Sequence, residues 1–352
     1  MADTPAPADP PRAEPSLAAP LDERGLLARL IEGPVSGDAL ARASGQTRAA
    51  VWKRIQSLRE AGVPIDAQAG RGYRLTQPFD LLDNGAILGA VPAPVRARLA
   101  SLEVAWVLDS TNSELQRRPG AGDGLASVLL TERQTGGRGR RGREWHSPLG
   151  AHIYLSLARS FSGGWSRLGG LSLVAGMATV GALHAFGYDM VRLKWPNDLV
   201  LVAPDGSLRK LGGLLLEGAG EHAGPVRAVI GLGLNVRMPE RFGLLLDQPW
   251  CELSTLPPAT PSRNSLAAAL IAHWVPALDE FDRTGLAPFL GRYAGLDAIA
   301  GRAIRLSSET GSIAGTALGL AADGALRVRL EDGSERCFHA GEVSVRTAGA
   351  AQ

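Results

Sequence analysis

The chain has 352 residues, a hydrophobic content of 45% and a formal net charge of +2 at pH 7. This length favours two or three domains with buried cores, and the balanced charge limits any affinity for polyanions to local clusters. The two cysteines, Cys251 and Cys337, have no CxxC spacing, which argues against a disulfide framework and favours a reducing compartment.

Residues 1–20 are rich in proline and alanine, and we expect a disordered tail there. The N-terminus has no basic region followed by an apolar run, so no signal peptide is expected.

The segment 168–188 carries no charge over 21 residues, which is long enough to cross a membrane. Its many glycines and alanines weaken its hydropathy, and its apolar residues recur at helical spacing. We interpret it as a buried core helix and expect a cytoplasmic protein without membrane contact.

Residues 21–78 predict a winged helix-turn-helix domain. Ser36 can cap a first helix, Gly45 ends it, and Thr47 can cap a second helix. The second helix presents an apolar stripe to the core, formed by Val51, Ile55 and Leu58. Its outer face and the following Gly-Arg-Gly turn carry the candidate DNA-binding residues Arg48, Trp52, Lys53, Gln56, Arg59 and Arg71. Cations there would offset phosphates and polar groups would read base edges, while a solvated basic helix is the alternative.

A linker around QPFDLLDNGAI leads to a mixed region at about 85–290. Hydrophobic periodicity there predicts helices at 111–118, 166–187 and 263–284, alternating with strand-like runs. The strand-like runs are EVAWVLD, LASVLLTE, HIYLSLAR, MVRLKW, KLGGLLLEG and RAVIGLGLNV. From about 297 to 347 the pattern changes to short alternating strands with ADG and EDG turns, which predicts a small β-barrel or sandwich.

The loop TGGRGRRGREWHSP, residues 135–148, places four arginines between Arg138 and Arg143. Its core matches the GxGxxG pattern of dinucleotide-binding folds, which also requires a helix directly after the glycines. Pro148 and Gly150 prevent such a helix, so we reject a Rossmann site, and no GxxxxGK[ST] sequence indicates a P-loop. What remains is a mobile loop whose arginines make bidentate phosphate contacts once an anion binds.

A second element, RLKWPNDLVL, predicts two strands joined by a tight turn at Pro196, Asn197 and Asp198. Lys194 ends the first strand beside the turn acid, where it can hold a negative group; a surface lysine near a common turn is the alternative. The apolar strands KLGGLLLEG and VIGLGLNV carry glycines where side chains are expected. Such glycines mark close approach by a ligand or another backbone, with plain packing as the alternative.

Together these motifs resemble the biotin–protein ligase family, in the bifunctional form that is also the biotin operon repressor. The resemblance covers about residues 30 to 347 and rests on DSTN (109–112), RQTGGRGRRGREWHSPLGAHIYLSL (133–157), KWPND (194–198), RKLGGLLLE (209–217) and GLGLNV (231–236). It implies an α+β protein in three domains. These are the winged helix, a class II synthetase-like ligase domain at 85–290 with a mixed, largely antiparallel sheet, and a C-terminal β-barrel at 297–347.

In this family the biotin carboxylate attacks the ATP α-phosphate, giving biotinyl-5′-AMP and pyrophosphate, and a carrier lysine then attacks the mixed anhydride. By resemblance Lys194, Arg138 and Arg140 are catalytic, because they offset the repulsion between the two anions. The implied biotin contacts are Ser110, Thr111, Asn112, Gln134, Arg138, Gly139, Arg140 and Lys194. The implied nucleotide contacts are Arg138, Arg140, Arg141, Trp145, Asn197, Asn235 and Trp250, and Mg²⁺ is expected on the phosphates beside Asn197.

The resemblance also implies partners. These are the biotin carboxyl carrier protein of acetyl-CoA carboxylase, operator DNA, and a second copy of the chain in a ligand-promoted homodimer. The dimer would form through the central sheet, with the strand HIYLSLAR at the partner's edge; His152 in this strand is expected to pack rather than to transfer protons. Three alternatives stay open: a ligase whose winged helix does not bind DNA, a ligand-sensing regulator without ligase activity, and a lipoate–protein ligase of the same fold.

Overall fold

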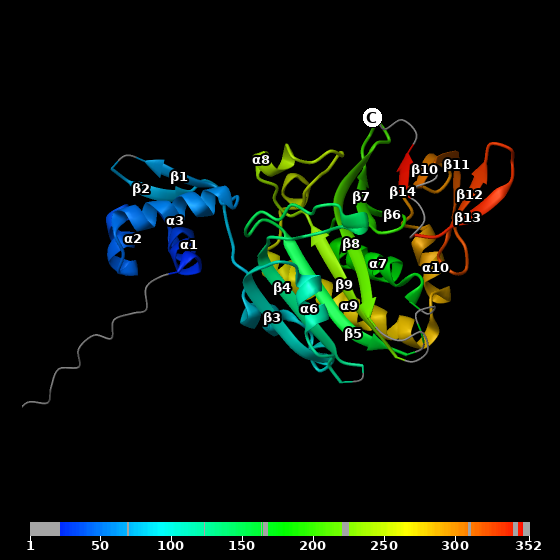
Figure 1. The fold of residues 1–352 in the computed structure, drawn as a ribbon, viewed down its shortest axis with the longest axis horizontal. Helices are drawn as coiled ribbons and strands as arrows, with labels where there is room; N and C mark the ends of the chain where they lie inside the picture. The colour runs from blue at the N-terminus through cyan, green and yellow to red at the C-terminus, as the bar shows by residue number, and fades with distance from the viewer. Residues whose placement is uncertain are drawn as a thin grey trace, which may run out of the picture. The chain divides into compact units, whose positions relative to one another are not determined.

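The computed structural model describes residues 22–68, 70–122, 124–162, 164, 168–219, 225–308, 311–340 and 344–347. The tail expected at 1–20 lies outside these residues. The chain divides into two compact units, one made of residues up to Ser57 together with Ile65–Thr76, and one made of Leu58–Pro64 together with the chain from Gln77 onward. Figure 1 shows the elements of both.

The N-terminal part of the chain folds as the capping pattern predicts. Its elements are α1 (Glu23–Glu32), α2 (Gly37–Ser44), α3 (Arg48–Glu60), β1 (Ile65–Gln68) and β2 (Gly72–Leu75). The amide of Ala39 donates to Ser36 Oγ at 3.1 Å, and α2 ends at Gly45 with φ 62°. The amide of Ala50 donates to Thr47 Oγ1 at 3.2 Å, which caps α3. Both helices of the predicted helix-turn-helix are therefore present, and antiparallel β1 and β2 follow them.

A seven-stranded sheet forms the centre of the larger unit (Figure 1). Its strands are β3 (Leu99–Leu108), β4 (Ala126–Gln134), β5 (Ile153–Phe161), β6 (Val191–Lys194), β7 (Asp198–Val202), β8 (Leu208–Ala219) and β9 (Val226–Leu234). They lie in the order β3-β4-β5-β9-β8-β7-β6. β3 pairs with β4 in parallel and the other neighbours pair antiparallel, which confirms the predicted mixed, largely antiparallel sheet.

The strand HIYLSLAR does not lie at an edge of this sheet. It forms most of β5, which pairs with β4 on one side and with β9 on the other. Both rows of its backbone hydrogen-bonding groups are therefore used within the chain. The expectation that this strand meets a partner's edge is wrong, because a run of apolar residues looks alike in a central strand and in an interface strand.

Helices cover the two faces of the sheet unequally. α7 (Leu171–His184) and α9 (Arg263–Thr284) pack together on one face over the main core, where Trp274 Nε1 donates to Thr179 Oγ1 at 2.9 Å. On the other face α6 (Thr111–Arg117) packs Leu115 against Val229 of β9. Because side chains alternate along a strand, Gly231 and Gly233 face the same side as Val229. This side of the sheet carries the cavity described below.

The predicted helices at 111–118 and 263–284 are confirmed as α6 and α9, whereas the helix expected at 166–187 is shorter. α7 begins at Leu171 because Gly170 before it has φ 84°, and residues 166–167 lie outside the described part. Most of its side chains are buried, so the interpretation as a core helix is confirmed. In the part of the chain that the structure describes, no helix is long and apolar enough to cross a membrane.

The segment expected to be a linker contains α4 (Asn84–Ala90), which Asp83 caps by accepting from the amide of Ala86 at 2.7 Å. Ile87 in this short helix is fully buried in the main core. Sequence periodicity could not indicate it, since two turns with two glycines carry too little pattern. Three further short helices were not expected: α5 (Ala93–Arg96), α8 (Glu240–Gly243) and α10 (Ala287–Ala294).

The C-terminal strands form a five-stranded antiparallel sheet in the order β13-β12-β11-β10-β14. They are β10 (Ala303–Ser308), β11 (Gly311–Leu320), β12 (Leu326–Leu330), β13 (Glu335–Phe338) and β14 (Ser344–Thr347). Among the described residues no pairing joins the outer strands β13 and β14. The strand-rich end is confirmed, and its closure into a barrel stays a prediction.

Candidate active site

A cavity of about 420 Å³ opens on the α6 side of the central sheet. Every residue predicted to contact biotin or nucleotide lines it. These residues are Ser110, Thr111, Asn112, Gln134, Arg138, Gly139, Arg140, Arg141, Trp145, Lys194, Asn197, Asn235 and Trp250. The first and last of them are more than a hundred residues apart in the sequence, and it is the fold that brings them together.

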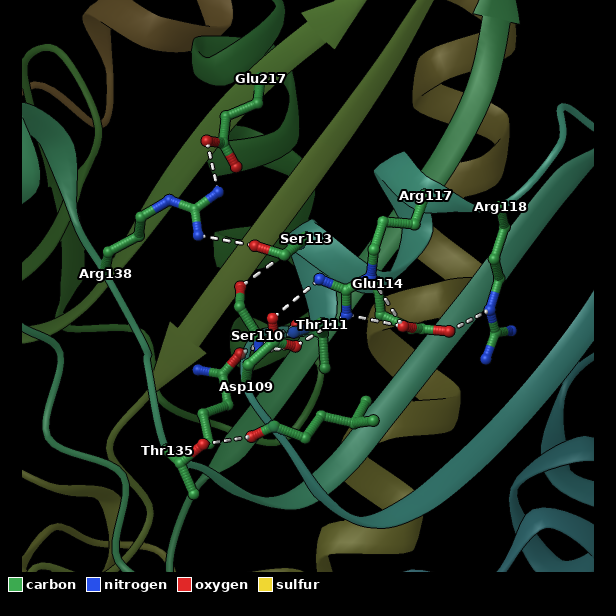
Figure 2. Close-up of polar contacts among 12 residues, drawn as sticks. Asp109, Ser110, Thr111, Ser113, Glu114, Arg117, Arg118, Thr135, Arg138 and Glu217 are labelled. Atoms are coloured by element: carbon green, nitrogen blue, oxygen red, sulfur yellow. Dashed lines mark hydrogen bonds and ion pairs between the residues drawn. The ribbon is translucent and has the colours of Figure 1, made fainter.

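The polar end of the cavity begins where β3 ends and α6 starts. Ser110 caps α6, and Gln134 Oε1 at the end of β4 accepts from the Thr111 amide at 2.9 Å and from its hydroxyl at 3.2 Å. Asp109 forms a bidentate pair with Arg117 at 2.8 and 2.9 Å (Figure 2). The hydrogen bonds from Arg117 lower the pKa of Asp109 to about 2. This ion pair ties both ends of α6 together and fixes the loop that carries Ser110 and Thr111.

Asn112 lies buried on the sheet directly over Gly231. A Cβ at Gly231 would stand 2.3 Å from Asn112 Oδ1, so only glycine leaves room for this amide. Gly233 likewise makes room for the Trp145 ring, from which an added Cβ would stand only 2.4 Å away. At Gly231 and Gly233 the groups that come close are the protein's own side chains, so these two glycines fit the packing alternative, and close approach by a ligand stays a prediction.

The arginine loop does not open a helix, as predicted. Its centre is a single 3₁₀ turn, Arg140–Gly142, in which Arg141 has φ 57°, and an isolated bridge pairs Arg138 with Glu144. Arg138 donates to Ser113 Oγ at 2.7 Å and to Glu217 Oε1 at 2.8 Å (Figure 2). The side chain of Arg138 is thus held at the cavity wall.

Arg140 reaches across to the C-terminal sheet and to the KWPND turn. Its guanidinium donates to the carbonyl of Ala340 and to Asn197 Oδ1, the latter at 3.3 Å. Burial lowers the pKa of Arg140, but a guanidinium stays protonated near neutral pH. A partly desolvated cation of this kind interacts strongly with an anion that enters the cavity.

Lys194 ends β6 and faces Asp198 across the hairpin to β7, as predicted. Its Nζ lies 3.8 Å from Asp198 Oδ2, and Lys210 Nζ lies 2.8 Å from Asp198 Oδ1. Burial lowers the pKa of Lys194, and Asp198 opposes that shift. Burial alone would raise the pKa of Asp198, but the two ammonium groups lower it overall. One buried carboxylate therefore holds two ammonium groups at the cavity.

The opposite end of the cavity is lined by aromatic and amide groups. Trp145 lies over β9 with Lys210 Nζ 5.6 Å from its ring centre, and its buried Nε1 has no hydrogen-bond partner among the described residues. Asn235 Nδ2 donates to the Cys251 carbonyl at 3.1 Å. Trp250 follows α8 and packs on Gly243, where a Cβ would come within 2.5 Å of its ring. A buried donor without a partner beside an open cavity is what a ligand acceptor would satisfy.

The donor set does not form a metal site of its own. Among the described residues no three histidine, cysteine or acidic side chains come together in a way that could hold a metal ion. Asn197, the residue predicted beside Mg²⁺, uses its Oδ1 for Arg140 and its Nδ2 for the Leu214 carbonyl at 2.6 Å. The residues present therefore do not fit a protein-bound Mg²⁺.

Among the polar residues at or beside the cavity that sequence reasoning did not predict are Ser156, Lys210, Glu217 and Arg346. Lys210 and Glu217 stand within and at the end of the RKLGGLLLE motif, so this motif contained the signal. Ser156 lies in an apolar strand and Arg346 in β14, far along the chain, and no local pattern marks either of them.

The candidate DNA-binding residues lie on α3 and on the turn between β1 and β2. The stripe of Val51, Ile55 and Leu58 is buried, as predicted. Arg48, Trp52, Lys53 and Arg71 are exposed, Trp52 at 54%, and Gln56 and Arg59 are half-buried. Arg48 forms an ion pair with Asp38 at 3.2 Å, and both side chains are exposed.

Three protein-family models match the chain. Residues 107–235 match the biotin/lipoate A/B protein ligase family, residues 24–74 match a helix-turn-helix domain, and residues 299–346 match the biotin protein ligase C-terminal domain. The chain is 38% identical to the bifunctional ligase/repressor BirA of Escherichia coli over 92% of this chain and 97% of that one. It is 25% identical to BirA of Bacillus subtilis over 87% and 92%, respectively.

Among solved structures, the biotin protein ligase of Aquifex aeolicus in complex with biotin and ATP superposes with a TM-score of 0.59 at 25% identity. That comparison covers 71% of this chain and all of the other. The three family models together match the central domain that carries the cavity, the helix-turn-helix and the C-terminal strands. The chain therefore belongs to the biotin protein ligase family, in the form that carries an N-terminal helix-turn-helix domain.

Proposed function

We propose that the chain is an ATP-dependent biotin–protein ligase that also acts as a biotin-responsive repressor. The observation that carries the ligase half is the convergence of Lys194, Arg140 and the polar end around Asn112 on one cavity. Two anions, a carboxylate and a triphosphate, must meet in the first step, and their repulsion requires cations at the meeting point. This cavity supplies them from two separate elements, Arg140 from the arginine loop and Lys194 from the end of β6.

In the first step a biotin carboxylate oxygen forms a bond to the ATP α-phosphorus, and the bond from that phosphorus to the bridging oxygen breaks. Pyrophosphate leaves with the electron pair. We assign Lys194 to the developing charge between carboxylate and α-phosphate, because its buried ammonium group is held beside Asp198 in the cavity. Arg138 and Arg140 hold the phosphates, and the guanidinium fork suits such contacts.

We assign the polar end of the cavity to the biotin ring, through Ser110, Thr111, Asn112 and Gln134, with Gly139 providing close approach of the loop. The nucleotide lies at the other end, with Arg141, Trp145, Asn197, Asn235 and Trp250. Two aromatic rings suit a flat base, and the unpaired Nε1 of Trp145 is available to an acceptor. Mg²⁺ would arrive on the ATP phosphates, where it keeps most of its water ligands.

In the second step the amine of a carrier lysine attacks the carbonyl carbon of the anhydride, and AMP leaves. The acceptor is the biotin carboxyl carrier domain of acetyl-CoA carboxylase. Until that domain docks, the arginine loop must retain the adenylate, because a free acyl-adenylate modifies any lysine it meets. Contacts of Arg140 with the Asn197 side chain and the Ala340 carbonyl support a loop that closes over its ligand.

For the repressor half, we propose that α3 enters the major groove and that Arg71 contacts a phosphate. A lone winged helix offers few phosphate contacts, so specific binding requires two copies on one face of the duplex. The homodimer is promoted by the adenylate. Because both the carrier domain and operator DNA are then partners, we place the protein in the cytoplasm.

The test of the ligase is to incubate the protein with biotin, ATP and a biotin carboxyl carrier domain and to analyse the carrier by mass spectrometry. We expect one biotinyl group on one lysine, which is absent without ATP and absent when that lysine is changed to arginine. In a parallel incubation with lipoate and a lipoyl carrier domain, transfer of lipoate together with no transfer of biotin would support the lipoate–protein ligase. If no acid is transferred while biotin still binds, the chain is a ligand-sensing regulator without ligase activity.

A further inference from the structure

Glu217 of β8 lies between two residues that the proposed function places on the ligand. Its Oε1 accepts from Arg138 at 2.8 Å, and its Oε2 accepts from Asn112 Nδ2 at 2.8 Å. Figure 2 shows the first of these contacts at the cavity wall, with Ser113 on the other side of the guanidinium. Each carboxylate oxygen therefore serves a different donor, and the contacts join the arginine loop to the polar end of the cavity.

The neighbours of Asn112 determine which way its amide points. Nδ2 donates to Glu217 Oε2 and to the Leu215 carbonyl at 3.2 Å, and both of these groups only accept. Oδ1 accepts from the Ser156 hydroxyl at 2.6 Å. A flipped amide would bring its oxygen against two acceptors, so the flipped form is strongly disfavoured.

This orientation limits what Asn112 can offer a ligand. An amide nitrogen carries two hydrogens, and both are committed within the protein, whereas the amide oxygen keeps a free lone pair. Asn112 is therefore an acceptor for the ligand and not a donor. A ring head group with an N–H, such as the ureido group of biotin, satisfies that acceptor, and a ring head group without an N–H leaves it unpaired at a cost.

We infer that Glu217 is a positioning residue that fixes the Asn112 amide as an acceptor for a ligand N–H, and so selects a ureido head group. The inference rests on the proposed function, because it assumes that the polar end of the cavity binds biotin. Arg138 also donates to Ser113 Oγ at 2.7 Å. A change at Glu217 does not remove this second partner, so we expect the phosphate end of the site to be disturbed much less.

The carboxylate is required because both of its partners are donors. A glutamine at this position has one accepting oxygen and one donating nitrogen, so it can satisfy either Arg138 or Asn112 but not both. Because the hydrogen bond to the charged guanidinium is the stronger one, the glutamine oxygen stays with Arg138 and the glutamine NH₂ group faces Asn112 Nδ2. In Glu217→Gln the Asn112 amide loses its fixed orientation, although the size and shape of the side chain barely change.

The experiment measures biotin-dependent ATP–pyrophosphate exchange for the wild type, Glu217→Gln and a control, Glu335→Gln. Glu335 is a matched control, because it too is a glutamate that accepts from two side-chain donors, in its case Arg327 at 2.9 Å and Arg329 at 3.5 Å, but on β13 of the C-terminal sheet. For Glu217→Gln we expect the KM for biotin to rise about tenfold, as for one lost hydrogen bond that leaves a buried group unpaired. The KM for ATP and the melting temperature stay near wild type, and the control changes none of these values.

An unchanged KM for biotin in an active, folded Glu217→Gln protein overturns the inference. Equal rises in both KM values with a lower melting temperature also overturn it, since they indicate a purely structural role. If Glu217→Gln does not fold, Glu217→Asp serves instead, because it keeps the charge but is too short to reach both donors; the same rise for biotin alone is expected. A wild type without biotin-dependent exchange overturns the proposed function itself, which distinguishes the two failures.

Discussion

Among single residues, Lys194 shows how burial in the fold changes the properties of an ammonium group. A lysine at the end of a strand is usually exposed, but here the hairpin and Asp198 hold its ammonium group in a mostly buried place, where burial lowers its pKa. Such a charge is poorly hydrated and therefore interacts strongly with a developing negative charge nearby.

We predict that Lys194→Ala abolishes adenylate formation and leaves the fold intact. The rate of biotin-dependent ATP–pyrophosphate exchange should fall by at least a hundredfold, as for loss of a preorganised electrostatic contact. Lys53→Ala, which removes a lysine from the exposed face of α3, is the control and should exchange at the wild-type rate. A Lys194→Ala protein that forms biotinyl-AMP at near the wild-type rate would show that the assigned role is wrong.

Arg140→Gly should release the adenylate early, because the loop loses its contacts to Asn197 and to the Ala340 carbonyl together with one phosphate clamp. The measurement is the spread of biotin onto bystander proteins in a mixture that also contains the carrier domain. Arg140→Lys keeps the charge but loses the fork, so we expect an intermediate spread. Target selectivity that stays at the wild-type level in both variants contradicts this prediction.

His152 provides a prediction about pH. It is fully buried, it accepts a hydrogen bond from the Val236 amide at 3.2 Å, and burial lowers its pKa to about 3. The unfolded chain binds a proton there below about pH 6.5, but the folded chain does not, so stability is lost as the pH falls from 6.5 towards 3. Between pH 7 and pH 5 the loss is about 2 kcal/mol.

His152→Asn keeps an acceptor near the Val236 amide and removes the titrating ring, so its unfolding free energy should lack that part of the slope. Denaturant unfolding at pH 7 and pH 5 measures the difference. Equal slopes in wild type and His152→Asn would mean that His152 is protonated in the folded protein.

The residues of the site could be predicted largely because they stand in motifs whose chemistry needs them, as GRGRRG and KWPND do. The residues that support the cavity-lining side chains from behind could not be predicted from local pattern. Ser156 is a polar residue in a buried strand, and its role is visible only in the folded sheet, where its hydroxyl lies 2.6 Å from Asn112 Oδ1. Glu217 and Lys210 belong to the RKLGGLLLE motif, but their partners lie on other elements.

At the scale of elements, strong signals near the ends of helices gave the right result. Ser36, Gly45 and Thr47 cap or end the helices that they were expected to cap or end. Weak or ambiguous signals gave wrong predictions. The segment expected to be a linker contains α4, and the strand expected at a partner's edge is the central strand β5. The linker is in fact anchored, because Asp80 accepts from the buried Arg263 at 3.0 Å. Such long-range pairings leave no trace in local periodicity.

The helix α3 carries the proposed DNA-binding role. We predict that Arg48→Ala and Lys53→Ala each weaken operator binding and reduce the slope of log affinity against log salt by about one, as for one lost phosphate contact. Biotin transfer to the carrier domain should be unaffected. Arg29→Ala on α1, whose arginine pairs with Glu32, is the control and should bind operator normally. If both α3 variants bind like the wild type, α3 is a solvated basic helix and not a reader of DNA.

In the whole molecule, we expect dimerisation to couple the ligand cavity to the DNA-binding unit. If the adenylate promotes the dimer and the dimer favours operator binding, then linkage requires that operator also favours adenylate binding. We further expect an excess of unbiotinylated carrier domain to oppose DNA binding, because it uses the adenylate and occupies the same face of the central domain.

The most direct test of this account is the affinity for a two-half-site operator with and without biotin and ATP. The operator is selected from random DNA by the wild-type protein with both ligands present. We predict that the two ligands together tighten binding at least tenfold and that neither does so alone. In Lys194→Ala they should have no effect, whereas added biotinyl-5′-AMP should restore tight binding. Equal operator affinity with and without the ligands, or a failure to select any operator, would contradict the account and leave only the ligase.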